Sequence, residues 1–154
     1  MADASRNQDF LDLLRAFVDA DVRFLVVGAY ALAVHGHPRG TGHLDVWIEA
    51  TPENARRAYG ALAAFGAPLH ELTQADLVTP DVVFQIGVAP RRIDILTSIS
   101  GVDFADAWPR RIEGVYGDVR FPVIGLDDLI ANKRAAGRPQ DLVDVEALER
   151  ERRR

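Results

Sequence analysis

The sequence predicts an α/β (α+β) fold, a small mixed β-sheet flanked by helices, with further helices at the C-terminal end. Two observations predict it. Apolar residues recur at helical spacing over residues 8–20, and they alternate with polar residues over 43–49, as in a strand. Helical and strand segments then follow one another without a repeat or a long linker. We therefore expect residues 1–154 to form a single domain, with a core over about 20–124 and closing helices over 125–154.

Composition excludes several classes of protein. Hydrophobic residues make up 48% of the chain and charged residues 27%, which is the balance of a folded domain. The absence of cysteine excludes a disulfide scaffold and a cysteine nucleophile. A net charge of −5 disfavours a general nucleic-acid binder. The sequence shows neither an apolar run of ~18 residues nor a secretory signal, so we expect a cytoplasmic protein without membrane contact.

The individual elements follow from local patterns. A β-branched apolar run over 22–27 predicts a buried strand that Gly28 ends, and residues 30–34 predict a short helix. Thr51 offers a capping hydroxyl to a helix over 52–65 that has proline in its first turn. The remaining segments are predicted in the same way, and they are a short helix around 74–78, strands over 82–88 and 92–97, a short helix over 103–108, a turn over 114–118, an edge strand over 119–123, and helices over 127–135 and 141–150.

A glycine stands where the first predicted strand meets the next helix. Without a side chain, Gly28 lets the backbone approach a ligand, and the free N–H groups of a new helix attract anions. Gly28 and Ala29 are therefore candidates for binding phosphate. Turn geometry alone also explains this glycine.

Two acidic residues stand inside predicted strands. His43 and Asp45 project from one face of their strand, while Leu44 points to the other. Asp94 lies between two isoleucines, where an acid is costly unless it is hydrogen-bonded, paired or bound to a metal. If the two strands are neighbours, Asp45 and Asp94 can converge on one divalent cation. The alternative is a solvated face on which these acids pair with arginines such as Arg39 or Arg91.

The stretch VVGAYALAVHGHPRGTGHLDVWI resembles the opening motif of the minimal nucleotidyltransferase superfamily, which has the polymerase-β-like fold. It is most similar to the bacterial group that includes the AbiEii-type toxin nucleotidyltransferases. Arg39, Thr41, Asp45 and Asp94 match that motif in order. The ending LIANKRAAGRPQDLVDVEAL is similar to the closing helices of that group, with Lys133, Arg138 and Asp141 at matching places. The resemblance covers about residues 20–150.

One residue departs from the family pattern. The family places its first aspartate where this chain has His43, so Asp45 corresponds to the second aspartate and Asp94 to the third. A neutral imidazole brings one nitrogen and no charge, which weakens Mg²⁺ binding and suits Mn²⁺ or Zn²⁺ better. An unperturbed histidine has a pKa of about 6.5 and is partly protonated near pH 7, and a protonated His43 would repel a cation.

The resemblance implies an enzyme that transfers a nucleoside monophosphate from a nucleoside triphosphate to a hydroxyl acceptor, using Mg²⁺ or Mn²⁺. Asp45 and Asp94 would be catalytic, and His43, Asp45 and Asp94 would ligate metal. The implied nucleotide-binding residues are Gly28, Ala29, Arg39, Thr41, Lys133 and Arg138. Lys133 and Arg138 have an alternative, which is pairing with acids such as Asp127, Asp128 or Asp141.

The sequence is therefore compatible with two functions. The first is a nucleotidyltransferase, impaired by His43, whose acceptor is tRNA, a protein or a small molecule. The second is a non-catalytic member that binds a nucleotide or a partner, for example an antitoxin in a toxin–antitoxin or phage-defence pair.

Overall fold

A computed structural model describes residues 7–38 and 42–154 of the chain. The described strands form one sheet in the order β3-β4-β2-β1-β6-β5. The strands are β1 (Phe24–Val27), β2 (His43–Ile48), β3 (Val83–Ile86), β4 (Arg92–Leu96), β5 (Ile112–Tyr116) and β6 (Val119–Val123). The helices are α1 (Gln8–Asp19), α2 (Gly28–Val34), α3 (Pro52–Phe65), α4 (Phe104–Ala107), α5 (Leu126–Ala136) and α6 (Pro139–Arg152), with 3₁₀ turns η1 (Asp76–Val78) and η2 (Trp108–Arg110).

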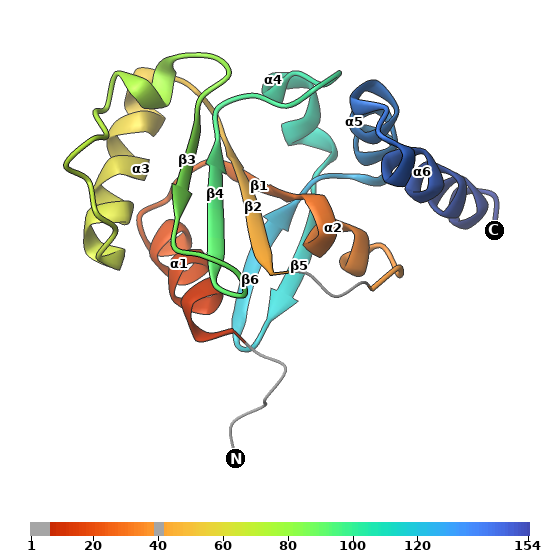
Figure 1. Cartoon of the computed structure of the whole chain (residues 1–154), viewed down its shortest axis with the longest axis horizontal. Coiled ribbons are helices and arrows are strands. Elements are labelled where there is room, and N and C mark those ends of the chain that lie inside the picture. Colours follow the sequence, from red (N-terminus) through yellow and green to blue (C-terminus); the bar gives the residue numbers. More distant parts are fainter. Residues whose placement is uncertain (1–6, 39–41) are drawn as a thin grey trace.

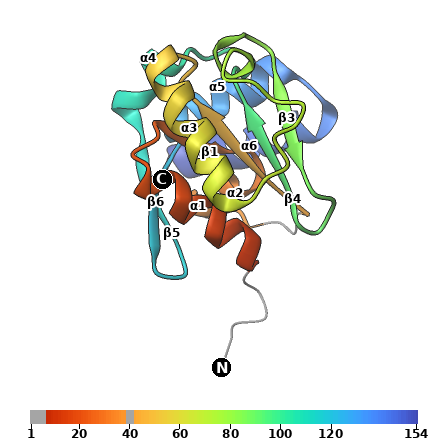
Figure 2. The same ribbon diagram turned by 90° about the vertical axis from the view of Figure 1, so that its left-hand side faces the viewer.

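The sheet is mixed, as predicted. β2 runs parallel to β4 and antiparallel to β1, and β1 runs parallel to β6. Helices α1 and α3 cover one face, and α2, α5 and α6 lie on the other side of the sheet (Figures 1 and 2). None of the helices in the described ranges is long and apolar enough to cross a lipid bilayer. The fold class expected from the sequence is therefore confirmed.

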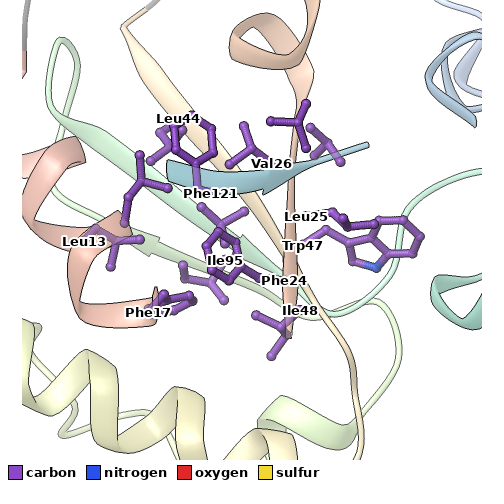
Figure 3. Close-up of a cluster of buried hydrophobic side chains, with 14 of the residues drawn as sticks. Leu13, Phe17, Phe24, Leu25, Val26, Leu44, Trp47, Ile48, Ile95 and Phe121 are labelled. Atoms are coloured by element: carbon purple, nitrogen blue, oxygen red, sulfur yellow. The ribbon is translucent and has the colours of Figure 1, made fainter. Parts of the chain in front are cut away.

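The core fills both faces of the central strands. Leu13 and Phe17 of α1 pack on one side, where Phe17 meets Phe24 edge to face at 5.4 Å between ring centroids. Trp47 projects to the opposite side and is 1% exposed (Figure 3). Full burial of such apolar side chains contributes about 1.5–3 kcal/mol each. This packing fixes the positions of β1 and β2, which carry the candidate site.

Two predictions about the ends of elements are wrong. The Thr51 hydroxyl does not cap α3; it donates to the Glu49 carboxylate at 3.2 Å instead. The helix predicted from residue 30 begins at Gly28, so the backbone turns from β1 directly into α2.

The turn predicted over 114–118 is confined to residues 117–118, because Gly114 belongs to a strand. β5 pairs antiparallel with β6 through Gly114 and Phe121, so β6 is an inner strand and β5 is the edge. A Cβ on Gly114 would lie 2.9–3.0 Å from Val123 and the Phe121 ring. This glycine therefore makes room for an aromatic side chain, which is a packing role that a turn signal does not distinguish.

A buried amide fixes the start of β1 against the end of β2. The Asn54 side chain of α3 accepts from the Arg23 N–H at 2.7 Å and donates to the Arg23 and Glu49 carbonyls at 2.9 and 2.8 Å. Asn54 is 3% exposed, so water cannot replace these hydrogen bonds.

We expect Asn54→Ala to lower the free energy of unfolding by about 3 kcal/mol, because three backbone groups lose a buried hydrogen bond, and the Arg23 carbonyl keeps only its bond from the Glu49 N–H. Denaturant unfolding measures this loss. Asn132→Ala is the matched control, since half-buried Asn132 donates one solvent-exposed hydrogen bond to the Ser100 carbonyl, and it should lose less than about 1 kcal/mol. Equal losses in the two variants would contradict the assigned role.

Candidate functional site

The parallel register of β2 and β4 brings two aspartates side by side. Asp45 pairs with Asp94, and His43 pairs with Arg92, two residues earlier on each strand. Ligand atoms of His43, Asp45 and Asp94 all lie within 4.8 Å of one another. Among the described residues, no other group of three or more His, Cys, Asp or Glu side chains converges in this way. The strands are therefore neighbours, which is the condition that the sequence left open.

Gly28 lies directly beside the Asp45 side chain. β1 and β2 pair Val27 with Asp45, so the bend at Gly28 passes directly beside this carboxylate. Gly28 has a φ of 69°, and a Cβ there would lie 2.3 Å from Asp45 Oδ2. Glycine is therefore required twice, once by the left-handed backbone and once by the carboxylate.

Burial sets the protonation of the site. Asp94 is 5% exposed, and the side chain of Asp45 is 18% exposed. Burial is the largest cause that raises the pKa of Asp45, and the neighbouring Asp94 carboxylate raises it further. His43, whose Nε2 lies 3.4 Å from Asp45 Oδ2, and Arg92 both act in the opposite direction. The balance leaves the pKa of Asp45 above its usual value, so ionising this carboxylate costs more free energy in the folded chain than in the unfolded chain.

Sequence reasoning missed one charged residue of the site. Arg92 donates to both oxygens of Asp94, with Nε 3.0 Å from Oδ1 and Nη2 2.7 Å from Oδ2. Arg39 and Arg91 were the expected partners; Arg91 is exposed, and Arg39 lies outside the described residues. The signal was present in the sequence, because residues two apart on a strand share a face.

The closing helices bring further charges. Lys133 of α5 is 6% exposed, and its Nζ lies 3.5 Å from Asp141 Oδ1 and 3.0 Å from Asp144 Oδ2. Arg138 donates to Asp141 at 2.7 Å. This hydrogen bond is the largest cause that raises the pKa of Arg138, and the Asp45 carboxylate adds to it. The start of α6 therefore lies within electrostatic range of Asp45.

The predicted nucleotide-binding residues are distributed unevenly around this point. Gly28 and Ala29 form the first turn of α2 beside Asp45. Arg138 is mostly exposed and faces the same region, whereas the ammonium of Lys133 is already engaged by two buried acids. Arg39 and Thr41 lie outside the described residues. The nucleotide-binding roles of all these residues stay predictions.

The donor atoms are spaced for a single cation. Two ligands on opposite sides of a divalent ion are separated by about 4 Å, which is close to the observed span. The set contains two carboxylates and one imidazole, so it suits Mn²⁺ better than Mg²⁺. His43, Asp45 and Asp94 therefore fit a divalent ion of moderate softness.

We expect Gly28→Ala to displace the Asp45 carboxylate and to destabilise the fold by more than backbone strain alone. Gly137→Ala is the matched control, because Gly137 has nearly the same φ of 68° but no atom closer than 3.6 Å to its added Cβ. The control should lose about 1–2 kcal/mol in denaturant unfolding. A loss no larger in Gly28→Ala would show that Asp45 does not constrain this position.

The raised pKa of Asp45 predicts a specific pH dependence. The folded state holds the Asp45 proton more tightly than the unfolded state, so stability is lost as the pH rises through the folded pKa. Asp45→Asn removes this loss. With a chelator present, the variant should therefore gain stability over the parent chain as the pH rises over the interval above about pH 4 in denaturant unfolding. A gain that shrinks over this interval would contradict the prediction.

Solved structures with the same architecture are nucleotidyltransferases. LnuA, a lincosamide antibiotic adenylyltransferase with lincomycin bound, is 15% identical with a TM-score of 0.58 over 93% of this chain and 96% of its own. ANT(2″)-Ia in complex with adenylyl-2″-tobramycin is 14% identical with a TM-score of 0.60 over 92% of this chain and 86% of its own. A Thermotoga maritima protein proposed to be a nucleotidyltransferase is 17% identical with a TM-score of 0.56 over 96% of this chain and 93% of its own.

No protein-family model and no curated protein matches the sequence. At 14–17% identity these likenesses concern the fold. Together with the strand order, they show that this chain shares the fold of these nucleotidyltransferases.

Proposed function

We propose that this chain binds a nucleoside triphosphate with a divalent cation and transfers a nucleoside monophosphate to a hydroxyl acceptor. One observation carries the proposal. Asp45 and Asp94 converge from neighbouring parallel strands beside the Gly28 bend, with His43 at the same point. Paired acids next to free backbone N–H groups suit a cation that carries phosphates.

The residues divide the work by position. His43, Asp45 and Asp94 would hold the cation, which supplies charge neutralisation on the phosphates and Lewis acidity. The N–H groups of Gly28 and Ala29 would donate to phosphate oxygens. Asp94 would accept the proton of the acceptor hydroxyl as that oxygen bonds to the α-phosphorus and pyrophosphate leaves. The described residues thus supply mainly placement and charge, which is the main demand of phosphoryl transfer.

A small molecule is the acceptor that we favour. LnuA and ANT(2″)-Ia, by their descriptions, act on or bind antibiotics, and this chain aligns with most of each protein's length. The net charge of −5 also disfavours a broad contact with tRNA. The similarity to AbiEii-type toxins, and the antitoxin partner that it implies, rest on the sequence motifs alone.

A second candidate is nucleotide binding without transfer. Two observations favour it. His43 replaces a carboxylate of the family motif, and Arg92 neutralises Asp94. Both features lower the negative charge that a catalytic cation requires.

The two candidates are separated by restoring the missing carboxylate. We expect His43→Asp to tighten Mg²⁺ binding on the order of tenfold, because a carboxylate adds a charge and two oxygens. Calorimetry measures binding, and transfer from labelled ATP to aminoglycoside acceptors measures activity. A rise in transfer supports the enzyme, whereas tighter Mg²⁺ binding without transfer supports the binding protein.

Two further variants control this experiment. His70→Asp adds the same charge at an exposed position and should leave Mg²⁺ affinity unchanged. Asp94→Ala should abolish both cation binding and transfer. If His43→Asp has the same Mg²⁺ affinity as the parent chain, the assigned site is wrong.

A further inference from the structure

Arg92 binds the Asp94 carboxylate, which the proposed cation would need as a ligand. Its guanidinium engages both oxygens of Asp94 in a bidentate pair, at 3.0 and 2.7 Å. Bidentate charge-assisted pairs are among the strongest polar contacts that a side chain makes. A cation that approaches Asp94 therefore meets a carboxylate that is already neutralised.

The two members of this pair differ in their freedom to move. The side chain of Asp94 is 7% exposed and is held by a central strand, whereas the side chain of Arg92 is 38% exposed. Arg92 also has the longer side chain, with more rotatable bonds. When the pair opens, Arg92 is the partner that leaves, and Asp94 stays at the site.

The position that Arg92 occupies on leaving is also constrained. Arg92 pairs with His43 across β2 and β4, on the face that carries both aspartates. A guanidinium released there stays beside the candidate site, where phosphate oxygens can accept its hydrogen bonds. Without an anion, the same release leaves the guanidinium with water alone.

From this geometry we propose that Arg92 makes the site select a cation–nucleotide complex over a free cation. This inference rests on the proposed function. Arg92 holds Asp94 closed when no ligand is bound. A free cation must displace the guanidinium and gives it no new partner. A cation bound to a triphosphate displaces it and offers phosphate in return, so binding of the cation and of the nucleotide is positively coupled through Arg92.

The coupling is measured by Mn²⁺ titration, with electron paramagnetic resonance detecting free Mn²⁺. Each titration is run alone and with a saturating ATP analogue whose α,β-bridge is a methylene group. In the parent chain the analogue should raise Mn²⁺ affinity on the order of tenfold above the analogue's own Mn²⁺ binding, within the usual range of coupling. Arg92→Gln should bind Mn²⁺ alone about tenfold more tightly than the parent chain and should lose most of this enhancement.

The chain offers a matched control pair. Arg110 donates to both oxygens of Asp128, at 3.0 and 2.8 Å, and Asp128 is 6% exposed. Asp128 belongs to no group of three converging ligands in the described residues. Arg110→Gln should therefore leave Mn²⁺ affinity unchanged. Arg92→Lys keeps the charge but loses the bidentate geometry, so its Mn²⁺ affinity should fall between those of the parent chain and Arg92→Gln. If Arg92→Gln does not fold, Arg92→Lys takes its place in the experiment.

The outcomes separate this inference from the proposed function. If the parent chain binds Mn²⁺ and Arg92→Gln binds it no more tightly, Arg92 is not a competitor and the inference is overturned, while the cation site stands. An equal rise in Arg110→Gln overturns it as well, because the gain is then a general effect of removing an arginine. If neither the parent chain nor Arg92→Gln binds Mn²⁺, with or without the analogue, the proposed function fails together with the inference.

Discussion

The parallel pairing of β2 with β4 is the constraint on which the rest of the site depends. It places Asp45 directly beside Asp94, near the centre of a six-stranded sheet. Two carboxylates at this spacing repel each other, and burial adds to the cost of ionising Asp45. The backbone hydrogen bonds of the sheet and the apolar core beneath it hold both groups in place despite this repulsion. The arrangement therefore opposes stability, which is typical of a site kept for binding or catalysis.

The surrounding side chains offset this repulsion in two different ways. The imidazole of His43 lies against Asp45, and the guanidinium of Arg92 brings a full positive charge to Asp94. The offset makes the ligand-free fold tolerable, and it also reduces the attraction for a divalent ion. In the function proposed above, this single set of contacts would decide both the stability of the sheet and the selectivity of the site. The same trade does not apply to the Arg110–Asp128 pair, whose bidentate geometry is equivalent but whose carboxylate belongs to no group of three converging ligands in the described part of the chain.

Much of the fold could be predicted because the spacing of apolar residues indicates helices and strands locally. The α1 helix and the β2 and β4 strands repeat apolar residues at the period of their own element. The site was predictable to the same extent, because Asp45 and Asp94 are acids inside apolar strands. Gly114 and Arg92 were missed for a shared reason. Each acts through a side chain that it meets in the folded sheet: Gly114 makes room for the Phe121 ring on the neighbouring strand β6, and Arg92 binds both oxygens of Asp94 two residues along its own strand. Glycine and arginine read alone indicate only a turn and a solvated charge.

The sequence by itself determined the fold class, the faces of the strands, and the candidates His43, Asp45 and Asp94, because side-chain alternation along a strand is local geometry. Only the tertiary structure decided that β2 and β4 are neighbours in parallel register and that Gly28 passes beside Asp45. These facts depend on strand order and register, which arise when distant segments bury their apolar faces together. The physical reason is that periodicity specifies which way a side chain points, whereas packing specifies what it meets.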